Sequence, residues 1–562
     1  MPPLKAFMDD KTILSSKEPG TRSLLSHLDD LMIWCRMAYK PKKSRSLSLR
    51  SGKVSQETKF QVGGQDIPTV SEMPVKSLGR WYDDSLKDTK QVKETVKTAE
   101  ENLQKIDRRP LPGKYKVWCL QHMLIPMLLW PLLIYEVATS TVEAIERKIN
   151  KFTRKWLGVP PGLTDVALYC KQAKLRLPLK SIVEEYKAGK VRLQMMLEDS
   201  PDEVVKSVQP SLRTGKKWKV QDAVVSAKEN LIQKEVIGLT QSGRMGLGIN
   251  KVQWWSKVSG KNRRDLVIQE VRNEENKSRY VKAVQQSQQG QWTNWDEALQ
   301  RTVTWNDLWQ MAPLRVSFIL RATYDLLPSR TNLVKWGKEN DPMCPLCKEK
   351  PQTMDHVLSS CKIALANGRY TWRHNKVLTE LARSIKEQMQ PETKDSALTF
   401  VTEGKKKKWV ASKKMPEISV GRNLIGTSEE WSMSADLPEW QSYPEFIKKT
   451  GQRPDIVLWS ESGAWVSLVE LSVPYESRLN EQHEYKLRKY EDLANQVTSE
   501  GYKCTIKPVE VGARGFVSAS TCQLLGQLGI KGHKRTATIK RLSETAEKCS
   551  MWLWARRNDS WS

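Results

Sequence analysis

The chain has 562 residues, and its 92 Lys and Arg against 64 Asp and Glu give a formal net charge of +28. This length corresponds to about three or four domains, which argues against one compact core. The charge indicates a polyanionic partner, for which nucleic acid is the simplest candidate. A merely soluble basic protein is the alternative. Many of the 22 Trp, however, stand beside Lys or Arg, a combination that suits nucleic acid because Trp can stack on bases while the cations contact phosphates.

The first 310 residues are predicted to be mainly helical. The expected helices lie at 23–37, at 82–110, twice within 112–158, and through 180–310, where the pattern is basic and rich in Gln and Trp. No motif in 180–310 indicates a chemistry. The N-terminus lacks a basic segment followed by an apolar core, and three of the nine Cys belong to one short motif, so secretion and a disulfide scaffold are disfavoured.

An apolar stretch at 117–135 has no charged residue for nineteen positions, as a membrane span would. Pro126 and Pro131, with Gln121 and His122, argue against a span, because a helix in lipid must satisfy its own backbone. We therefore expect a broken, buried helix and no membrane partner.

A cluster of Cys and His follows at 344–361. Cys344, Cys347, His356 and Cys361 have the spacing C-x2-C-x8-H-x4-C, which can close a tetrahedron around Zn²⁺. Four protein ligands leave no open position, so the zinc would be structural. The alternative is three buried reduced cysteines and an unrelated His. We expect His374, thirteen residues further on, to contact nucleic acid or to pack rather than to be a fifth ligand.

Segments 390–450 resemble a linker in composition, and β-branched strands then appear at 455–459, 465–473 and 503–511, with a helix at 477–497. The order strand, strand, helix, strand predicts a separate α/β domain. If Ser460 to Gly463 forms the turn, Asp455 lies opposite Leu468 and Glu470 is its diagonal neighbour, about 7–8 Å away.

Asp455 and Glu470 could then share one Mg²⁺, while Lys486 and Lys489 project from one side of the following helix. A lysine there can polarise an attacking water or steady a phosphate. In the alternative reading Asp455 caps a hairpin, Glu470 is an exposed strand residue and the lysines form a solvated helix face.

The residues 453–455, 469–476 and 484–490 closely resemble the restriction-like endonuclease of non-long-terminal-repeat retrotransposons. The resemblance implies a PD-(D/E)xK fold in which Ser472 stands in the usual lysine position and the following helix supplies the lysine, at Lys486 or Lys489. It continues through 508–516 and into 552–554, which makes Glu476, Glu510 and Arg514 secondary nuclease candidates. Packing or an ordinary salt bridge explains each of these three equally well.

Upstream segments are similar to the same family's reverse transcriptase. Residues 6–10, including Asp9 and Asp10, resemble the motif that holds catalytic Mg²⁺, and 39–44, 77–81 and 112–180 resemble the elements that follow it, the last being the thumb. The polymerase needs a third carboxylate and the fingers, which would precede Met1. We therefore expect a truncated element or an incomplete gene model without RNA-directed DNA polymerase activity.

These interpretations predict a multidomain α+β protein. The expected segments are a palm remnant (1–110), a thumb (111–185), a basic helical linker (186–312), a CCHC zinc-knuckle region (313–385), a basic linker (386–445) and the nuclease with C-terminal helices (446–562).

The expected function is a Mg²⁺- or Mn²⁺-dependent DNA endonuclease that nicks target DNA so that the 3′ hydroxyl primes reverse transcription; its partners would be target DNA and element RNA. The alternative is a nuclease-inactive remnant that binds DNA or RNA. We expect synthesis and assembly in the cytoplasm and action in the nucleus. The lysines 405–408, 413 and 414 fit a nuclear localisation signal or solvated linker charge equally.

Overall fold

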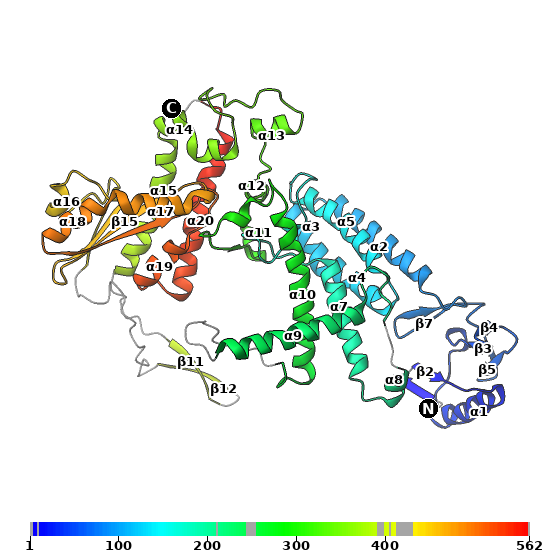
Figure 1. Cartoon of the computed structure of the whole chain (residues 1–562). Helices are drawn as coiled ribbons and strands as arrows, with labels where there is room; N and C mark the ends of the chain where they lie inside the picture. Colours follow the sequence, from blue (N-terminus) through cyan, green and yellow to red (C-terminus); the bar gives the residue numbers. More distant parts are fainter. Residues whose placement is uncertain are drawn as a thin grey trace. The chain divides into compact units, whose positions relative to one another are not determined.

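A computed structural model describes residues 4–7, 10–208, 212–242, 255–389, 398–403, 406–411 and 431–559 (Figure 1). The chain divides into two compact units. Unit 1 contains residues 1–156 and 179–278, and unit 2 contains residues 157–178 and 279–562. The expected mixture of helices and strands is confirmed.

Unit 1 begins with local antiparallel hairpins and continues as helices. The hairpins are β1 (Leu4–Phe7) with β2 (Asp10–Ile13), β3 (Ser48–Arg50) with β4 (Lys53–Ser55), β5 (Phe60–Val62) with β6 (Gln65–Ile67), and β7 (Val75–Ser77) with β8 (Arg80–Tyr82). The helices are α1 (Glu18–Trp34), α2 (Thr89–Arg108), α3 (Gly113–Cys119), α4 (Ile125–Ile134), α5 (Thr139–Trp156), α7 (Ile182–Glu198), α8 (Glu203–Val208), α9 (Val220–Ser242) and most of α10 (Gly260–Val284). A 3-10 turn spans Pro41–Lys43.

The apolar stretch forms the interrupted helix Gly113–Ile134, in which a π-helical turn, Leu120–Leu124, separates α3 from α4. By length and composition this helix could cross a membrane, as the core helix of a soluble protein also could. The expected break is confirmed, but burial is one-sided. Leu120, Leu124, Leu128 and Leu132, four residues apart, are buried, whereas Met123, Met127 and Trp130 are exposed.

Unit 2 contains the remaining helices and strands. Before the C-terminal sheet they are α6 (Val166–Tyr169), β9 (Leu175–Arg176) paired with β10 (Arg301–Thr302), α11 (Trp305–Gln310), α12 (Pro313–Thr323), α13 (Arg330–Lys335), α14 (Lys362–Ala366), α15 (Arg369–Met389) and the hairpin of β11 (Leu398–Glu403) with β12 (Lys406–Ala411). A 3-10 turn spans Gln291–Asn294 and a π-helical turn spans His356–Ser360.

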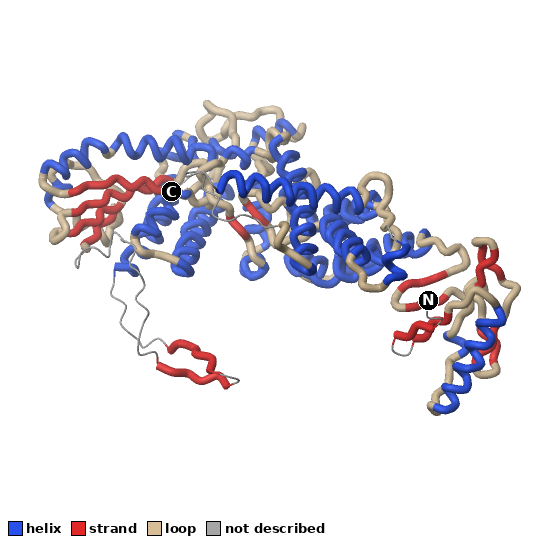
Figure 2. Tube along the Cα trace, turned by 60° about the horizontal axis from the view of Figure 1, so that its bottom comes forward, coloured by secondary structure: helices blue, strands red, loops and turns tan. Residues whose placement is uncertain are grey.

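The C-terminal sheet has the strand order β13-β14-β15-β16. Its strands are drawn in red in Figure 2. Its strands are β13 (Ser432–Ala435), β14 (Ile456–Ser460), β15 (Trp465–Ser472) and β16 (Lys503–Glu510), and the associated helices are α16 (Glu445–Lys448), α17 (Leu479–Lys489), α18 (Glu491–Ser499), α19 (Ala519–Gln527) and α20 (Gly532–Ala555). A 3-10 turn at Glu476–Arg478 precedes α17. Among the four strands of this sheet only the pair of β15 and β16 is parallel, because α17 and α18 form the crossover between them.

Both faces of this sheet are buried. Ile456, Val469 and Val509 pack on one face in a core shared with α15, α19 and α20. Val457, Val466 and Leu468 pack on the other, against residues of α16 and α18. Two buried faces explain why the strands are apolar runs instead of alternating.

The three expected strands and their order are confirmed. The expected helix at 477–497 is two helices that meet at Tyr490. Residues 432–435, within the segment 386–445 that was expected to be a linker, form the edge strand β13. The sequence offers only Ser-Met-Ser-Ala there, without β-branched residues, so propensity gave no signal. The six segment boundaries stay predictions.

Candidate active site and zinc centre

The zinc motif forms a compact cluster at the start of α14 and α15. One ligand atom from each of Cys344, Cys347, His356 and Cys361 lies within 4.8 Å of the others. The Lys348 amide donates to the Cys344 carbonyl at 2.8 Å, and Lys348 takes a φ of 57°, which closes the turn that holds both knuckle cysteines. The sequence prediction that these four residues meet is confirmed.

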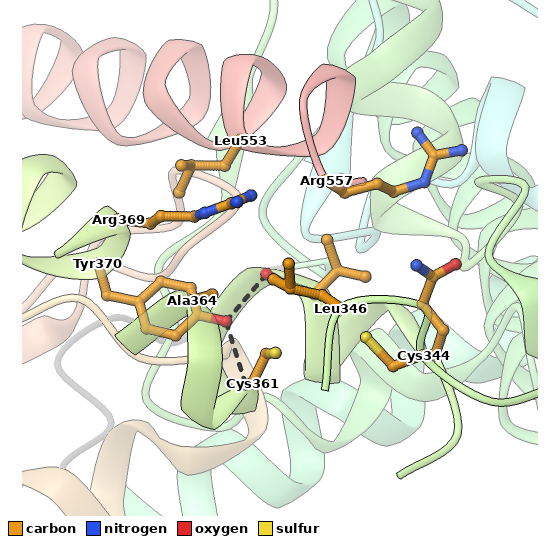
Figure 3. Close-up of a pocket in the computed structure, with 10 residues that line it drawn as sticks. Cys344, Leu346, Cys361, Ala364, Arg369, Tyr370, Leu553 and Arg557 are labelled. Carbon is orange, nitrogen blue, oxygen red and sulfur yellow. Dashed lines mark hydrogen bonds between the residues drawn. The ribbon is translucent and has the colours of Figure 1, made fainter. Parts of the chain in front are cut away.

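Tyr370 of α15 holds the returning half of the cluster. Its hydroxyl accepts a hydrogen bond from the Cys361 amide at 3.1 Å and donates to the Val357 carbonyl at 3.0 Å. Figure 3 shows Cys344 and Cys361 on one side of a small hollow and Leu553 of α20 on the other. The cluster therefore packs against both α15 and α20.

The donor set suits Zn²⁺. Burial lowers the pKa of His356, which favours the neutral imidazole that binds metal. Burial raises the pKa of Cys344; in Cys347, backbone hydrogen bonds outweigh burial and lower the pKa of the thiol. Three cysteines and one His at this spacing fill a tetrahedral site without an open position, as in structural zinc sites.

A second polar cluster lies where β14 begins. Extension of the β14–β15 register from Ile456↔Val469 places Asp455 directly opposite Glu470. The Asp455 amide donates to Glu470 Oε1 at 3.0 Å, and the Leu471 amide donates to Asp455 Oδ2 at 2.8 Å. Glu470 is fully buried and Asp455 is 9% exposed. The alternative of an exposed Glu470 is therefore wrong.

The expected register was wrong by two residues. Ser460 pairs with Trp465, so the turn is Glu461 to Ala464 instead of Ser460 to Gly463. Ala464 takes the left-handed conformation, with φ of 47°, that closes the turn one residue later. When a four-residue turn moves by one position, the partner of each strand residue shifts by two. Glu470 therefore becomes the direct partner of Asp455 instead of its diagonal neighbour.

The two candidate lysines of α17 differ in their contacts. Lys486 Nζ donates to Glu470 Oε2 at 2.8 Å and lies 3.7 Å from Asp455 Oδ2. Lys489 Nζ instead contacts the Tyr490 hydroxyl at 3.3 Å and lies over its ring. Both ammonium groups lie over the Tyr490 ring, but of the two only Lys486 contacts the carboxylates of Asp455 and Glu470.

His374 of α15 completes the cluster. Its Nε2 lies 3.4 Å from Asp455 Oδ2 and 3.2 Å from the Leu471 carbonyl, and its Nδ1 lies 3.1 Å from the Asn375 side-chain oxygen. The expectation that it is not a fifth zinc ligand agrees with these contacts. The residues that surround His374 in the sequence did not indicate that it lies beside Asp455, which is eighty-one positions later in the chain.

The surroundings shift the pKa values of Asp455 and Glu470 in opposite directions. Burial, and then the charge of Asp455, raise the pKa of Glu470 to about 7. Burial acts to raise the pKa of Asp455 as well, but His374 and Lys486 outweigh it and lower that pKa. For Lys486, burial is outweighed by both carboxylates, which raise its pKa. A buried pair that resists double ionisation in this way is a place where a cation is favoured.

Two carboxylates are the protein ligands that Mg²⁺ commonly uses, with waters and substrate phosphates filling the remaining positions. Asp455 and Glu470 thus fit such an ion, with Lys486 beside them. The spacing of these residues in the sequence is also compatible with a purely structural role, and their convergence in one buried cluster weighs against that role.

The secondary candidates Glu476 and Arg514 pair with each other. Arg514 Nε donates to Glu476 Oε2 at 2.5 Å, and the Arg514 amide donates to Oε1 at 2.6 Å. The guanidinium lies 4.0 Å from the ring centres of both Trp295 and Tyr475. Both charged side chains are almost fully buried, which supports the packing explanation.

Glu510, at the end of β16, is the third secondary candidate. One of its oxygens lies 2.9 Å from His483 Nδ1, and the other accepts a hydrogen bond from Ser520. His483 precedes Lys486 by three residues on α17. Glu510 is therefore in the layer of the sheet that faces α17, but its partners are His483 and Ser520 rather than the Asp455 pair.

The structure says little about the predicted polymerase aspartates and the linker lysines. Asp10 begins β2 and is exposed, and Asp9 lies outside the described residues. Of the linker lysines, residues 406–408 lie in β12, whereas 405, 413 and 414 lie outside the described part. The loss of polymerase activity stays a prediction.

Comparisons with known proteins agree with the zinc motif. A family model described as zinc-binding in reverse transcriptase matches residues 286–367, which include all four cluster residues. The chain is 19% identical over 391 residues to the retrovirus-related Pol polyprotein from type-2 retrotransposable element R2DM of Drosophila melanogaster. This match covers 68% of the chain and 33% of that protein, so the chain spans about a third of the relative's length.

The zinc-binding match and the geometry of the four ligands support a structural zinc site. Together with the similarity to the Pol polyprotein, the match supports identification of the chain as a protein of a non-long-terminal-repeat retrotransposon.

Proposed function

We propose that the C-terminal part of unit 2 is a metal-dependent DNA endonuclease of the PD-(D/E)xK kind. Its task would be to nick target DNA so that the released 3′ hydroxyl primes reverse transcription. The single observation that carries the proposal is the buried meeting of Asp455, Glu470 and Lys486, from two strands and one helix.

The surrounding architecture supports this assignment. The acid at the start of β14 and the acid within β15 face each other on one side of a four-stranded sheet, the side on which α17 presents Lys486. Ser472 occupies the position two residues after Glu470 where related nucleases usually have their lysine. Lys486 supplies the ammonium from the following helix.

Each residue has a distinct proposed role. Asp455 and Glu470 would hold Mg²⁺ or Mn²⁺, which when bound offsets the charge of the phosphorane transition state and acidifies water. Lys486 would orient the attacking water or the scissile phosphate by donating from Nζ. Exclusion of solvent around Glu470, which is fully buried, strengthens these interactions.

The proposed partners are target DNA and element RNA, and the proposed site of action is the nucleus, where chromosomal DNA lies. The net charge of +28 supports phosphate binding that weakens as salt rises. Substitutions in the cluster should therefore change the cleavage rate without changing the affinity for DNA. The many cations supply affinity, whereas the three residues of the cluster supply the chemistry.

The test is nicking of supercoiled plasmid, run beside a gel-shift titration at one salt concentration. Asp455→Asn and Glu470→Gln should lower the nicking rate by orders of magnitude with little change in DNA affinity. Lys486→Met should do the same, whereas its matched control Lys489→Met should retain most of the rate, because Lys489 does not contact the carboxylates.

A parent protein that binds DNA but never nicks it in Mg²⁺ or Mn²⁺ would establish the alternative function, a nuclease-inactive binding remnant. Undiminished nicking by Asp455→Asn would instead show that the active site lies elsewhere.

A further inference from the structure

His374 lies on a helix, α15, that carries none of the proposed nuclease residues, yet its imidazole reaches the first of them. We propose that His374 is a positioning residue of the proposed nuclease, which holds the Asp455 carboxylate in the orientation that binds the catalytic cation. The inference rests on the proposed function and adds to it a residue outside the PD-(D/E)xK motif.

The helix backbone around His374 is held firmly. The neighbouring Arg373 is 1% exposed, and it donates to the Val473 carbonyl and to the Ser550 hydroxyl, both at 3.0 Å. Val377 and Leu378, one turn later, are fully buried in the core that α15 shares with the sheet. The position of the His374 backbone relative to β15 is therefore set by the packing of α15 and not by the imidazole's own contacts.

The neighbours of Nε2 define which atom carries hydrogen. Both are acceptors, the Asp455 carboxylate oxygen and the Leu471 carbonyl, so Nε2 must be the protonated nitrogen and act as a donor. The Leu471 amide donates to the same Oδ2. Leu471 of β15 thus contacts both side chains: its carbonyl lies beside Nε2 of His374, and its amide donates to the Asp455 carboxylate.

The result is an asymmetric carboxylate. Oδ2 faces the Leu471 amide, His374 and, at 3.7 Å, Lys486, whereas Oδ1 accepts no hydrogen bond from any described residue. A carboxylate held through one oxygen presents the other to a cation. Partners that orient metal ligands in this way commonly change metal affinity about 10- to 100-fold when they are removed.

A purely packing role predicts something different. The His374 side chain is 24% exposed, so an apolar or shorter residue there would cost little if only volume mattered. A direct contact with nucleic acid would change DNA affinity instead of cation affinity. The three roles therefore separate by what is measured.

Two matched substitutions isolate the donor. In His374→Gln the side-chain amide can reach the position of Nε2, and in His374→Asn it can reach only the position of Nδ1, beside Asn375. The measurement is Mn²⁺ affinity of the zinc-loaded full chain by electron paramagnetic resonance, without DNA. Glu470→Gln identifies the Mn²⁺ signal of this site by removing it.

We expect His374→Asn and His374→Ala to weaken Mn²⁺ binding at this site by about 10-fold or more, and His374→Gln to stay within about 3-fold of the parent. At saturating Mn²⁺ the Asn variant should recover much of its nicking rate, with DNA affinity unchanged throughout. Thermal unfolding of each variant checks that the fold is retained.

Equal Mn²⁺ affinities for Asn, Gln and parent would overturn the inference while leaving the proposed nuclease intact, provided that the parent nicks DNA. A parent that neither binds Mn²⁺ nor nicks would overturn the nuclease itself and the inference with it. A loss of DNA affinity in the Asn variant, with Mn²⁺ affinity retained, would assign His374 to nucleic-acid contact instead.

Discussion

Replacement of Glu476 by Gln should destabilise unit 2 without damaging the nuclease chemistry. Glu476 is 1% exposed and accepts two hydrogen bonds from Arg514, from Nε and from the backbone amide. Gln keeps the shape and one good acceptor but removes the charge that balances a guanidinium buried between Trp295 and Tyr475. The buried cation would then lack a counter-charge.

The expected cost follows from this burial. Loss of one partner from a buried ion pair costs about 3–5 kcal/mol. Because Gln retains an acceptor and Arg514 also donates to the Tyr475 hydroxyl and the Ala322 carbonyl, we expect the lower end, about 3 kcal/mol. That is a large share of the roughly 5–15 kcal/mol that stabilises a typical domain.

Urea unfolding measures the effect, with near-ultraviolet circular dichroism reporting on Trp295 and its neighbours. The control is Glu445→Gln, which removes an exposed pair with Lys448 and should leave the unfolding midpoint unchanged. The double variant Glu476→Leu, Arg514→Met should be more stable than Glu476→Gln, because it removes both buried charges.

An unchanged urea midpoint in Glu476→Gln would refute the reasoning from burial. A variant that stays fully folded and still loses nicking would move Glu476 from the core into the active site.

Two further outcomes follow from the structure. Cys347→Ser should lower the bound zinc from about one equivalent to well below half by metal analysis, since three ligands remain of a closed four-ligand site. Unchanged zinc content would show that these four residues do not hold the zinc. In unit 1, burial lowers the pKa of Lys190 to about 8, so the unfolded chain binds more protons between pH 8 and about 10.4. The free energy of unfolding should rise with pH across that window, by at most about 1.4 kcal/mol per pH unit from this group. Lys190→Met should reduce the slope, and an equal slope in chemical denaturation at several pH values would contradict the assigned burial.

The local features of this protein were predictable from the chain itself. The four zinc ligands lie within eighteen residues, so their spacing alone restricts how they can meet. The three longer strands of the sheet were predictable for a similar reason, because β-branched runs between turns reflect strands buried on both faces. The pairing of an acid before β14 with an acid in β15 also needed only a hairpin.

The details of the candidate site depend on less local terms. The turn closes at Ala464 instead of Gly463, and this shift of one residue decides that Asp455 faces Glu470 directly. Choosing Lys486 over Lys489 requires the rotation of α17 about its axis, which its packing against the sheet determines.

The arrival of His374 beside Asp455 and the meeting of Glu476 with Arg514 are decided only by the tertiary structure. Their partners are separated by 81 and 38 positions, so no periodicity or turn preference links them. The physical reason is that local backbone preferences act over a few residues, whereas the burial of α15 and the sheet in one shared core sets which distant side chains meet.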